Sequence, residues 1–202
     1  MRATLAGLAL IALLPSCSLG PQSKGPIATY DFGVDTQAAP QRRITPTLLV
    51  PNVVSPSWLD SPAIVYRLAY QEAGRPQIYA FSRWTAPPAA LLSQRLRARL
   101  AIASNGGVIA QADSARADHV VNVDLEEFSQ IFDTAQSSRG VVRARVSLIS
   151  SARRSLSAQK VFSVERPAAS ADANGGARAL AEASEELVAQ VIEWLAANPT
   201  LK

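Results

Sequence analysis

The sequence predicts an α+β fold in which two principal helices pack on one face of a mainly antiparallel β-sheet. Three observations lead to this prediction. Apolar and polar residues alternate within several runs between residues 64 and 164, as is typical of strands with one buried face. Apolar residues at helical spacing occur between those runs, and again after the last of them. The resulting order of strands, helix, strands and helix is typical of an α+β domain.

The first strands are predicted to be short. Residues 29–33 are interpreted as a first short strand, and residues 34–43 as a loop. Prolines at positions 46, 51 and 56 interrupt the apolar residues 44–54, which favours an edge strand or strand fragments there. Residues 64–70 and 77–81 are rich in β-branched and aromatic residues, and a segment with one glycine separates them. This pattern predicts a hairpin.

A helix is predicted from the proline pair 87–88 to residue 103, because proline is well tolerated in a first helical turn. Leu92, Leu96 and Leu100 recur every four residues and should form its buried stripe. The sequence Asn-Gly-Gly at residues 105–107 should end the helix.

The run from His119 to Phe132 predicts a strand with an irregularity. Its apolar residues alternate up to Leu125 and then resume on the other parity at Phe128, which indicates a β-bulge or bend around Glu126 and Glu127. Alternation within residues 142–148 and 156–164 predicts two further strands, which together with the first form an antiparallel meander. A last helix, with one apolar face, should run from about residue 174 to residue 197, before Pro199.

The amino terminus has the anatomy of a secretory signal. Arg2 precedes ten mostly apolar residues, a stretch too short to cross a bilayer, and Cys17 follows. Leu14-Pro15-Ser16-Cys17 resembles the bacterial lipobox, which makes Cys17 the expected lipid-attachment residue; the alternative is a plain secretory signal with an unpaired cysteine near its end. The predicted organisation is a signal peptide at 1–16, lipidated Cys17 and a flexible tether at 17–28, and a single domain at 29–202.

Composition excludes several classes of site. One cysteine cannot form an internal disulfide, and one cysteine with one histidine cannot complete a structural zinc shell. The net charge of +4 is mild, and no nucleic-acid-binding motif accompanies it, so we expect no nucleic-acid partner. The sequence predicts no catalytic, cofactor-binding or metal-binding residues, and it assigns none to partner binding.

Each candidate polar residue also has a purely structural interpretation. His119 could belong to a Ser-His-Asp set, but no nucleophile-elbow motif accompanies it, so a structural or surface histidine is favoured. A carboxylate pair for acid–base chemistry could come from the acidic residues of the predicted bulge, although they are more simply solvent-facing. Contact with a phosphate group or a lipid headgroup is the alternative to a solvated face for the arginines. These candidates are Asp124, Glu126 and Glu127, and Arg83, Arg95, Arg97, Arg99, Arg143 and Arg145.

Aromatic residues are concentrated in one third of the chain. At least half of them should belong to the core, and any exposed ones would mark a partner surface. They are Trp58, Tyr66, Tyr70, Tyr79, Phe81 and Trp84.

With these elements in order, the chain resembles the ABC-type transport auxiliary lipoprotein family over about 170 residues. Each landmark is weak alone, but their order and spacing behind a lipobox make the match fairly specific. The landmarks are Trp58-Leu59-Asp60-Ser61-Pro62, Tyr79-Ala80-Phe81-Ser82-Arg83-Trp84, Val123-Asp124-Leu125-Glu126-Glu127-Phe128-Ser129-Gln130 and Phe162-Ser163-Val164-Glu165-Arg166-Pro167.

The resemblance implies a non-enzymatic partner of an ABC transporter that carries an MCE-domain protein and moves phospholipid or other hydrophobic molecules across the cell envelope. It implies a chain with no cofactor, anchored through palmitate and related acyl chains on Cys17 to the periplasmic face of the outer membrane, where it docks the MCE component. A homo-oligomer of this chain is also possible under this interpretation, because the sequence does not determine the oligomeric state. The alternatives are an envelope lipoprotein that binds a lipid-like ligand in an apolar cavity, or one that supports assembly of another envelope complex.

Overall fold

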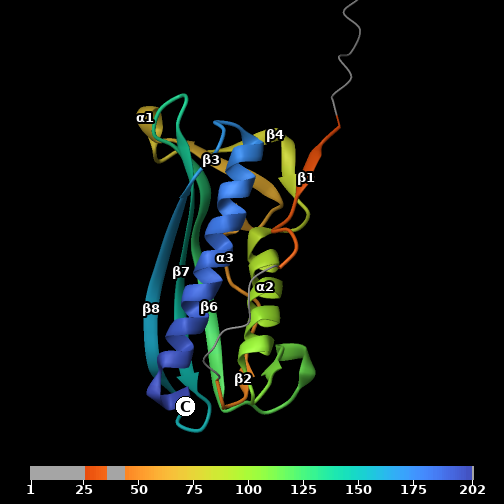
Figure 1. Ribbon diagram of the computed structural model, residues 1–202, viewed down its shortest axis with the longest axis vertical. Helices are drawn as coiled ribbons and strands as arrows, with labels where there is room; N and C mark the ends of the chain where they lie inside the picture. The colour runs from red at the N-terminus through yellow and green to blue at the C-terminus, as the bar shows by residue number, and fades with distance from the viewer. Residues whose placement is uncertain (1–25, 36–43, 202) are drawn as a thin grey trace, which may run out of the picture.

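The computed structural model describes residues 26–35 and 44–201, and the predicted α+β class is confirmed within them. Figure 1 shows α3 lying over the long strands of the sheet, with α2 beside it on the same face. The strands are β1 (Ala28–Tyr30), β2 (Leu48–Leu49), β3 (Ala63–Leu68), β4 (Pro76–Trp84), β5 (Val108–Ile109), β6 (His119–Phe132), β7 (Ser138–Ser150) and β8 (Ser155–Pro167). The α-helices are α1 (Ala69–Glu72), α2 (Pro88–Ala103) and α3 (Ala173–Ala197), and 3-10 turns occur at Ser57–Leu59, Gln111–Asp113 and Pro199–Leu201.

The predicted meander is confirmed. β6 and β8 pair antiparallel on either side of β7, and the register of β6 against β7 shifts between Leu125 and Glu127. Glu126 is the extra residue of this β-bulge. Because of it, both Leu125 and Phe128 face the core, each about 1% exposed, although they differ in parity.

The whole sheet is mixed, which refines the prediction of a mainly antiparallel one. The β3–β4 hairpin is antiparallel as expected, but β3 runs parallel to β6, and β1 runs parallel to β4. β2 pairs parallel with both β5 and β6, so it lies inside the sheet. Residues 44–54 therefore form strand fragments, as one of the two predictions had it, and the edge-strand alternative is wrong.

Both predicted helices are present with nearly the expected bounds. α2 begins at Pro88, and its stripe of Leu92, Leu96 and Leu100 is at most 2% exposed. α3 begins after Asp172, whose carboxylate accepts a hydrogen bond of 2.8 Å from the N–H of Gly175. This hydrogen bond lowers the pKa of Asp172 below its ordinary value. The buried face of α3 covers the meander and carries the residues predicted for it, namely Leu180, Ala183, Leu187, Val191 and Leu195.

Candidate functional site

The expected lipid-attachment residue lies outside the described residues. Cys17, the signal-peptide boundary and most of the tether therefore stay predictions. The described chain starts at residue 26 and enters the sheet through β1 (Figure 1). Residues 28–35, which we call the anchor-proximal segment, are the first part of the chain that contacts the domain, so their attachment decides how a membrane anchor would hold it.

The anchor-proximal segment is held by both backbone and side-chain contacts. Tyr30 pairs with Trp84 in the β1–β4 ladder, and the carbonyl of Tyr30 accepts a hydrogen bond of 2.8 Å from the N–H of Thr85. The Phe32 ring is 8% exposed and lies edge-on to Trp84 at 5.7 Å and stacked on Phe128 at 6.0 Å. Phe32 thus continues the core into this segment, and the partly buried Tyr30 packs against the core beside it.

Two buried arginines of α2 connect the segment to both helices. Arg95 donates a hydrogen bond to the carbonyl of Gly33 and forms an ion pair with Glu185 of α3, and Arg99 lies 3.4 Å from the carboxylate of Asp35. The Arg95 and Arg99 side chains are 12% and 5% exposed. The predicted solvated face is therefore wrong for these two arginines, because α3 and residues 33–35 cover that side of α2.

Burial dominates the electrostatics of this ion pair. Desolvation raises the pKa of Glu185 above the ordinary glutamate value, while the nearby Arg95 guanidinium opposes that rise. Burial therefore destabilises the charged form of Glu185, and Arg95 offsets part of that destabilisation. Periodicity alone could not identify Phe32, Asp35 or Glu185 as parts of this site, although the Asp31-x-Gly33 spacing is a recognisable turn signal, with Asp31 accepting from the N–H of Gly33 at 2.8 Å.

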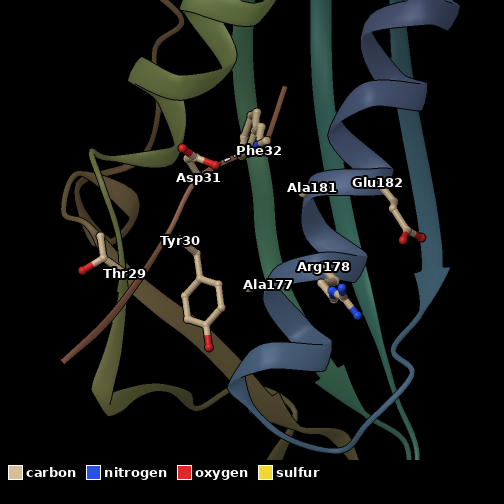
Figure 2. Close-up of a pocket in the computed structure, with 9 residues that line it drawn as sticks. Thr29, Tyr30, Asp31, Phe32, Ala177, Arg178, Ala181 and Glu182 are labelled. Atoms are coloured by element: carbon tan, nitrogen blue, oxygen red, sulfur yellow. Dashed lines mark hydrogen bonds between the residues drawn. The ribbon is translucent and has the colours of Figure 1, made fainter. Parts of the chain in front are cut away.

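A groove of about 390 Å³ runs between the anchor-proximal segment and α3. Figure 2 shows the small residues Ala177 and Ala181 on the helix turns that face Tyr30 and Phe32, while charged side chains of α3 point away from the segment. The groove is open, and the charged residues Asp31, Arg178 and Glu182 are also among those that line it. It does not resemble the enclosed apolar cavity that the alternative of a lipid-binding module requires.

The carboxylates of the bulge are paired with arginines on the outer face of the sheet. Asp124 lies 2.9 Å from Arg145, and Glu126 lies 3.0 Å from Arg143. Glu127 lies 3.4 Å from Arg67, whose guanidinium stacks over the Trp58 ring at 4.9 Å. Arg97 donates to Asn52 at 3.1 Å. Asp124 and Glu126 thus belong to surface ion pairs, in agreement with the favoured interpretation of solvent-facing carboxylates. The Glu127 side chain is only 23% exposed and its partner Arg67 16%, so that ion pair is largely buried.

His119 is a buried residue at the start of β6. It is 8% exposed, its N–H donates to the carbonyl of Thr47 at 3.3 Å, and it pairs with Ser150 across the sheet. This agrees with a structural histidine. Across residues 26–35 and 44–201, no group of three or more His, Cys, Asp or Glu side chains is placed to hold a metal ion.

The aromatic residues are less buried than predicted, since only one of the six is buried in the core. Trp84 is in the core, and Trp58 and Tyr79 pack against it. Tyr79 also donates a hydrogen bond of 2.8 Å to Gln130, and burial raises its pKa above the ordinary tyrosine value. Tyr70 and Phe81 are 44% and 53% exposed, so they are the candidates for contact with a partner.

These features define an α+β fold in which the N-terminal segment contacts both helices and charged residues of the sheet surface form ion pairs. The family model of the ABC-type transport auxiliary lipoprotein component matches residues 30–192, and the chain belongs to this family. It is thus an auxiliary component of an ABC-type transport system in the cell envelope. In the part of the chain that the structure describes, no helix combines the length and apolarity needed to cross a bilayer.

Solved structures share the fold. Protein XCC0632 from Xanthomonas campestris, described as a DUF330 protein, is 21% identical, with a TM-score of 0.74 over 86% of this chain and 97% of that one. A second, uncharacterized protein is 16% identical, with a TM-score of 0.63 over 84% and 99%. The PelC dodecamer from Paraburkholderia phytofirmans is 15% identical, with a TM-score of 0.48 over 80% of this chain and 94% of that one, and is too distant to bear on assembly. No curated protein sequence is significantly similar to this chain.

Proposed function

We propose that this chain is a non-enzymatic, lipid-anchored auxiliary component of an MCE-type ABC transport system for phospholipid or other hydrophobic molecules. In this proposal, acylated Cys17 anchors the chain to the periplasmic face of the outer membrane, and the domain docks the MCE component there. Family membership supports the transport role. Two or more acyl chains on one cysteine would supply the stable anchoring that a single chain does not.

The observation that carries this proposal is the attachment of the anchor-proximal segment. Residues 18–26, nine residues after Cys17, span at most about 30 Å when extended. Beyond them the chain joins the β1–β4 ladder, inserts Phe32 into the core and contacts α2 through Asp35. A short tether joined to a firmly held segment would keep the domain at a limited distance from the membrane, as a docking component needs.

The test is crosslinked capture of the MCE component from cells that express the lipidated chain. Intact cells are treated with a membrane-permeable crosslinker, the chain is purified, and crosslinked proteins are identified by mass spectrometry. We expect the MCE component in the capture from the native chain and a strong loss from a Cys17→Ser variant, which should fractionate away from membranes while staying folded. Absence of the MCE component when the transporter complex is otherwise intact contradicts the docking proposal.

A further inference from the structure

Three large apolar side chains are exposed together where the chain enters the domain. Ile27, Ile78 and Phe81 are 50%, 62% and 53% exposed. In the β1–β4 register Ala28 pairs with Ser82, so the preceding residue, Ile27, lies next to Phe81. These three residues are called the β4 patch below.

The β4 patch lies on the face of the sheet opposite the helices. Tyr79 and Trp84 of β4 point toward the core, where Tyr79 reaches Gln130 and Trp84 packs on Phe128. Ile78 therefore points outward, since neighbouring residues of a strand alternate between faces. The register of β4 against β3 shifts between Ile78 and Arg83, so beyond this irregularity alternation is counted from the inward-pointing Trp84, which puts Phe81 on the same outer face.

The position of the anchor indicates what covers this patch. Ile27 lies ten residues after Cys17, a distance of at most about 35 Å when extended. An acylated Cys17 therefore keeps the patch close to lipid at all times, and such tethering makes even a weak contact occur at high effective concentration. A protein partner would gain no such advantage from the tether.

The chemistry of the surroundings also favours a lipid surface. Arg75 comes just before β4 and Arg83 comes near its end, and both are exposed. Arg75 has only a long contact, 4.0 Å, with Glu72. Apolar and aromatic side chains flanked by arginine are typical of surfaces that enter the boundary between headgroups and acyl chains, where basic groups meet anionic headgroups.

We propose that Ile27, Ile78 and Phe81 form a membrane-contact surface, so that the domain lies with the outer face of β1 and β4 against the lipid bilayer. This inference rests on the proposed function through the anchor at Cys17. It adds an orientation, because it leaves α2 and α3, on the opposite face of the sheet, directed away from the membrane.

The test places an environment-sensitive fluorophore, NBD, on the lipidated chain in vesicles of phosphatidylethanolamine and phosphatidylglycerol at 3:1. Single cysteines for labelling are introduced as Ile78→Cys or Phe81→Cys, since acylated Cys17 does not react. Val54→Cys and Val161→Cys are the matched controls, because these apolar residues are also exposed, at 63% and 43%, but lie outside the patch. We expect blue-shifted emission and several-fold stronger quenching by doxyl-labelled lipids at positions 78 and 81 than at 54 and 161.

Vesicle flotation separates failure of the anchor from failure of the patch. Water-like emission at positions 78 and 81 in chains that float overturns the membrane-contact surface and leaves the anchor intact. If the chains do not float, an N-terminal histidine tag bound to nickel-chelating lipid replaces the acyl anchor on chains that also carry Cys17→Ser, so that only the introduced cysteine is labelled. Water-like emission there also overturns the surface. Emission that shifts only after the MCE component is added identifies the patch as a protein-docking surface and overturns the lipid contact.

Discussion

Arg95 is the residue that joins most parts of the candidate site. Its guanidinium contacts the carbonyl of Gly33 in the anchor-proximal segment and the carboxylate of Glu185 in α3, while its backbone belongs to α2. A buried ion pair contributes little more than a well-packed apolar pair would, but removal of one partner leaves the other charge buried and uncompensated. The main effect of removing Arg95 should therefore be to leave the Glu185 carboxylate buried without a compensating charge.

We expect Arg95→Ala to lower the free energy of unfolding by about 3 kcal/mol at pH 7, the range for breaking a buried pair. Without Arg95, the folded-state pKa of Glu185 should rise further above the ordinary value of 4.5. The folded variant then binds a proton that the unfolded chain releases above pH 4.5, so the loss of stability should shrink as the pH falls toward that value. Urea unfolding at pH 7 and pH 4.5 measures this.

Arg97→Ala is the matched control for that experiment. Arg97 lies on the same helix but bonds to Asn52 at an exposed position, so its removal should cost much less at either pH. An Arg95→Ala cost that stays constant between pH 7 and pH 4.5 would show that Glu185 is not the group left uncompensated.

At the scale of elements, long strands were predictable and short ones were not. The alternation in β6, β7 and β8 extends over many residues, and a single change of parity predicted a β-bulge or bend around Glu126 and Glu127, which the structure places at Glu126. β2 and β5 have two residues each, too few to show a period, and their parallel pairing depends on neighbours far away in sequence. The burial of Arg99 was missed for the same reason, since a helix pattern does not show what packs on it.

Deletion of Glu126 should unfold the domain, whereas Glu126→Ala should cost less than about 1 kcal/mol, as expected for an exposed ion pair. Without the extra residue, Leu125 and Phe128 can no longer both face the core, because a shift of one residue turns side chains to the other face. Circular dichroism during thermal unfolding compares the two variants. A deletion variant that melts like the wild-type chain would mean that the bulge does not set the register.

The contact between β7 and α3 depends on a glycine. A Cβ at Gly140 would lie 2.7 Å from the backbone of Ala179 and of Leu180, so Gly140→Ala must push the helix away from the sheet. We expect a loss of about 1–3 kcal/mol, as for other overpacked positions. Denaturant unfolding measures it, with Gly74→Ala as control, because nothing lies within 4 Å of a Cβ there. Equal stability of the two variants would contradict this close packing.

For the whole molecule, the sequence predicted that an anchor precedes the domain, but not how the segment that joins them packs on the domain. The lipobox-like sequence predicts an anchor at Cys17, and the α+β class follows from periodicity. The position of residues 28–35 relative to α2 and α3 depends on tertiary packing, which no sequence pattern shows. Phe32 shows this. It is one aromatic residue in a segment without periodicity, and only the fold brings it between Trp84 and Phe128.

Phe32→Ala should therefore detach the anchor-proximal segment before the rest of the domain unfolds. Loss of a buried phenylalanine costs about 3–5 kcal/mol, which exceeds what the three residue pairs of β1 and β4 can supply on their own. Hydrogen exchange on the lipidated chain should show faster exchange confined to residues 28–33, together with weaker capture of the MCE component. Phe162→Ala, which removes another buried ring, 2% exposed and 5.8 Å from Trp194, should destabilise the domain without this selectivity. If both variants open residues 28–33 alike, Phe32 is ordinary core and does not couple the anchor to the domain.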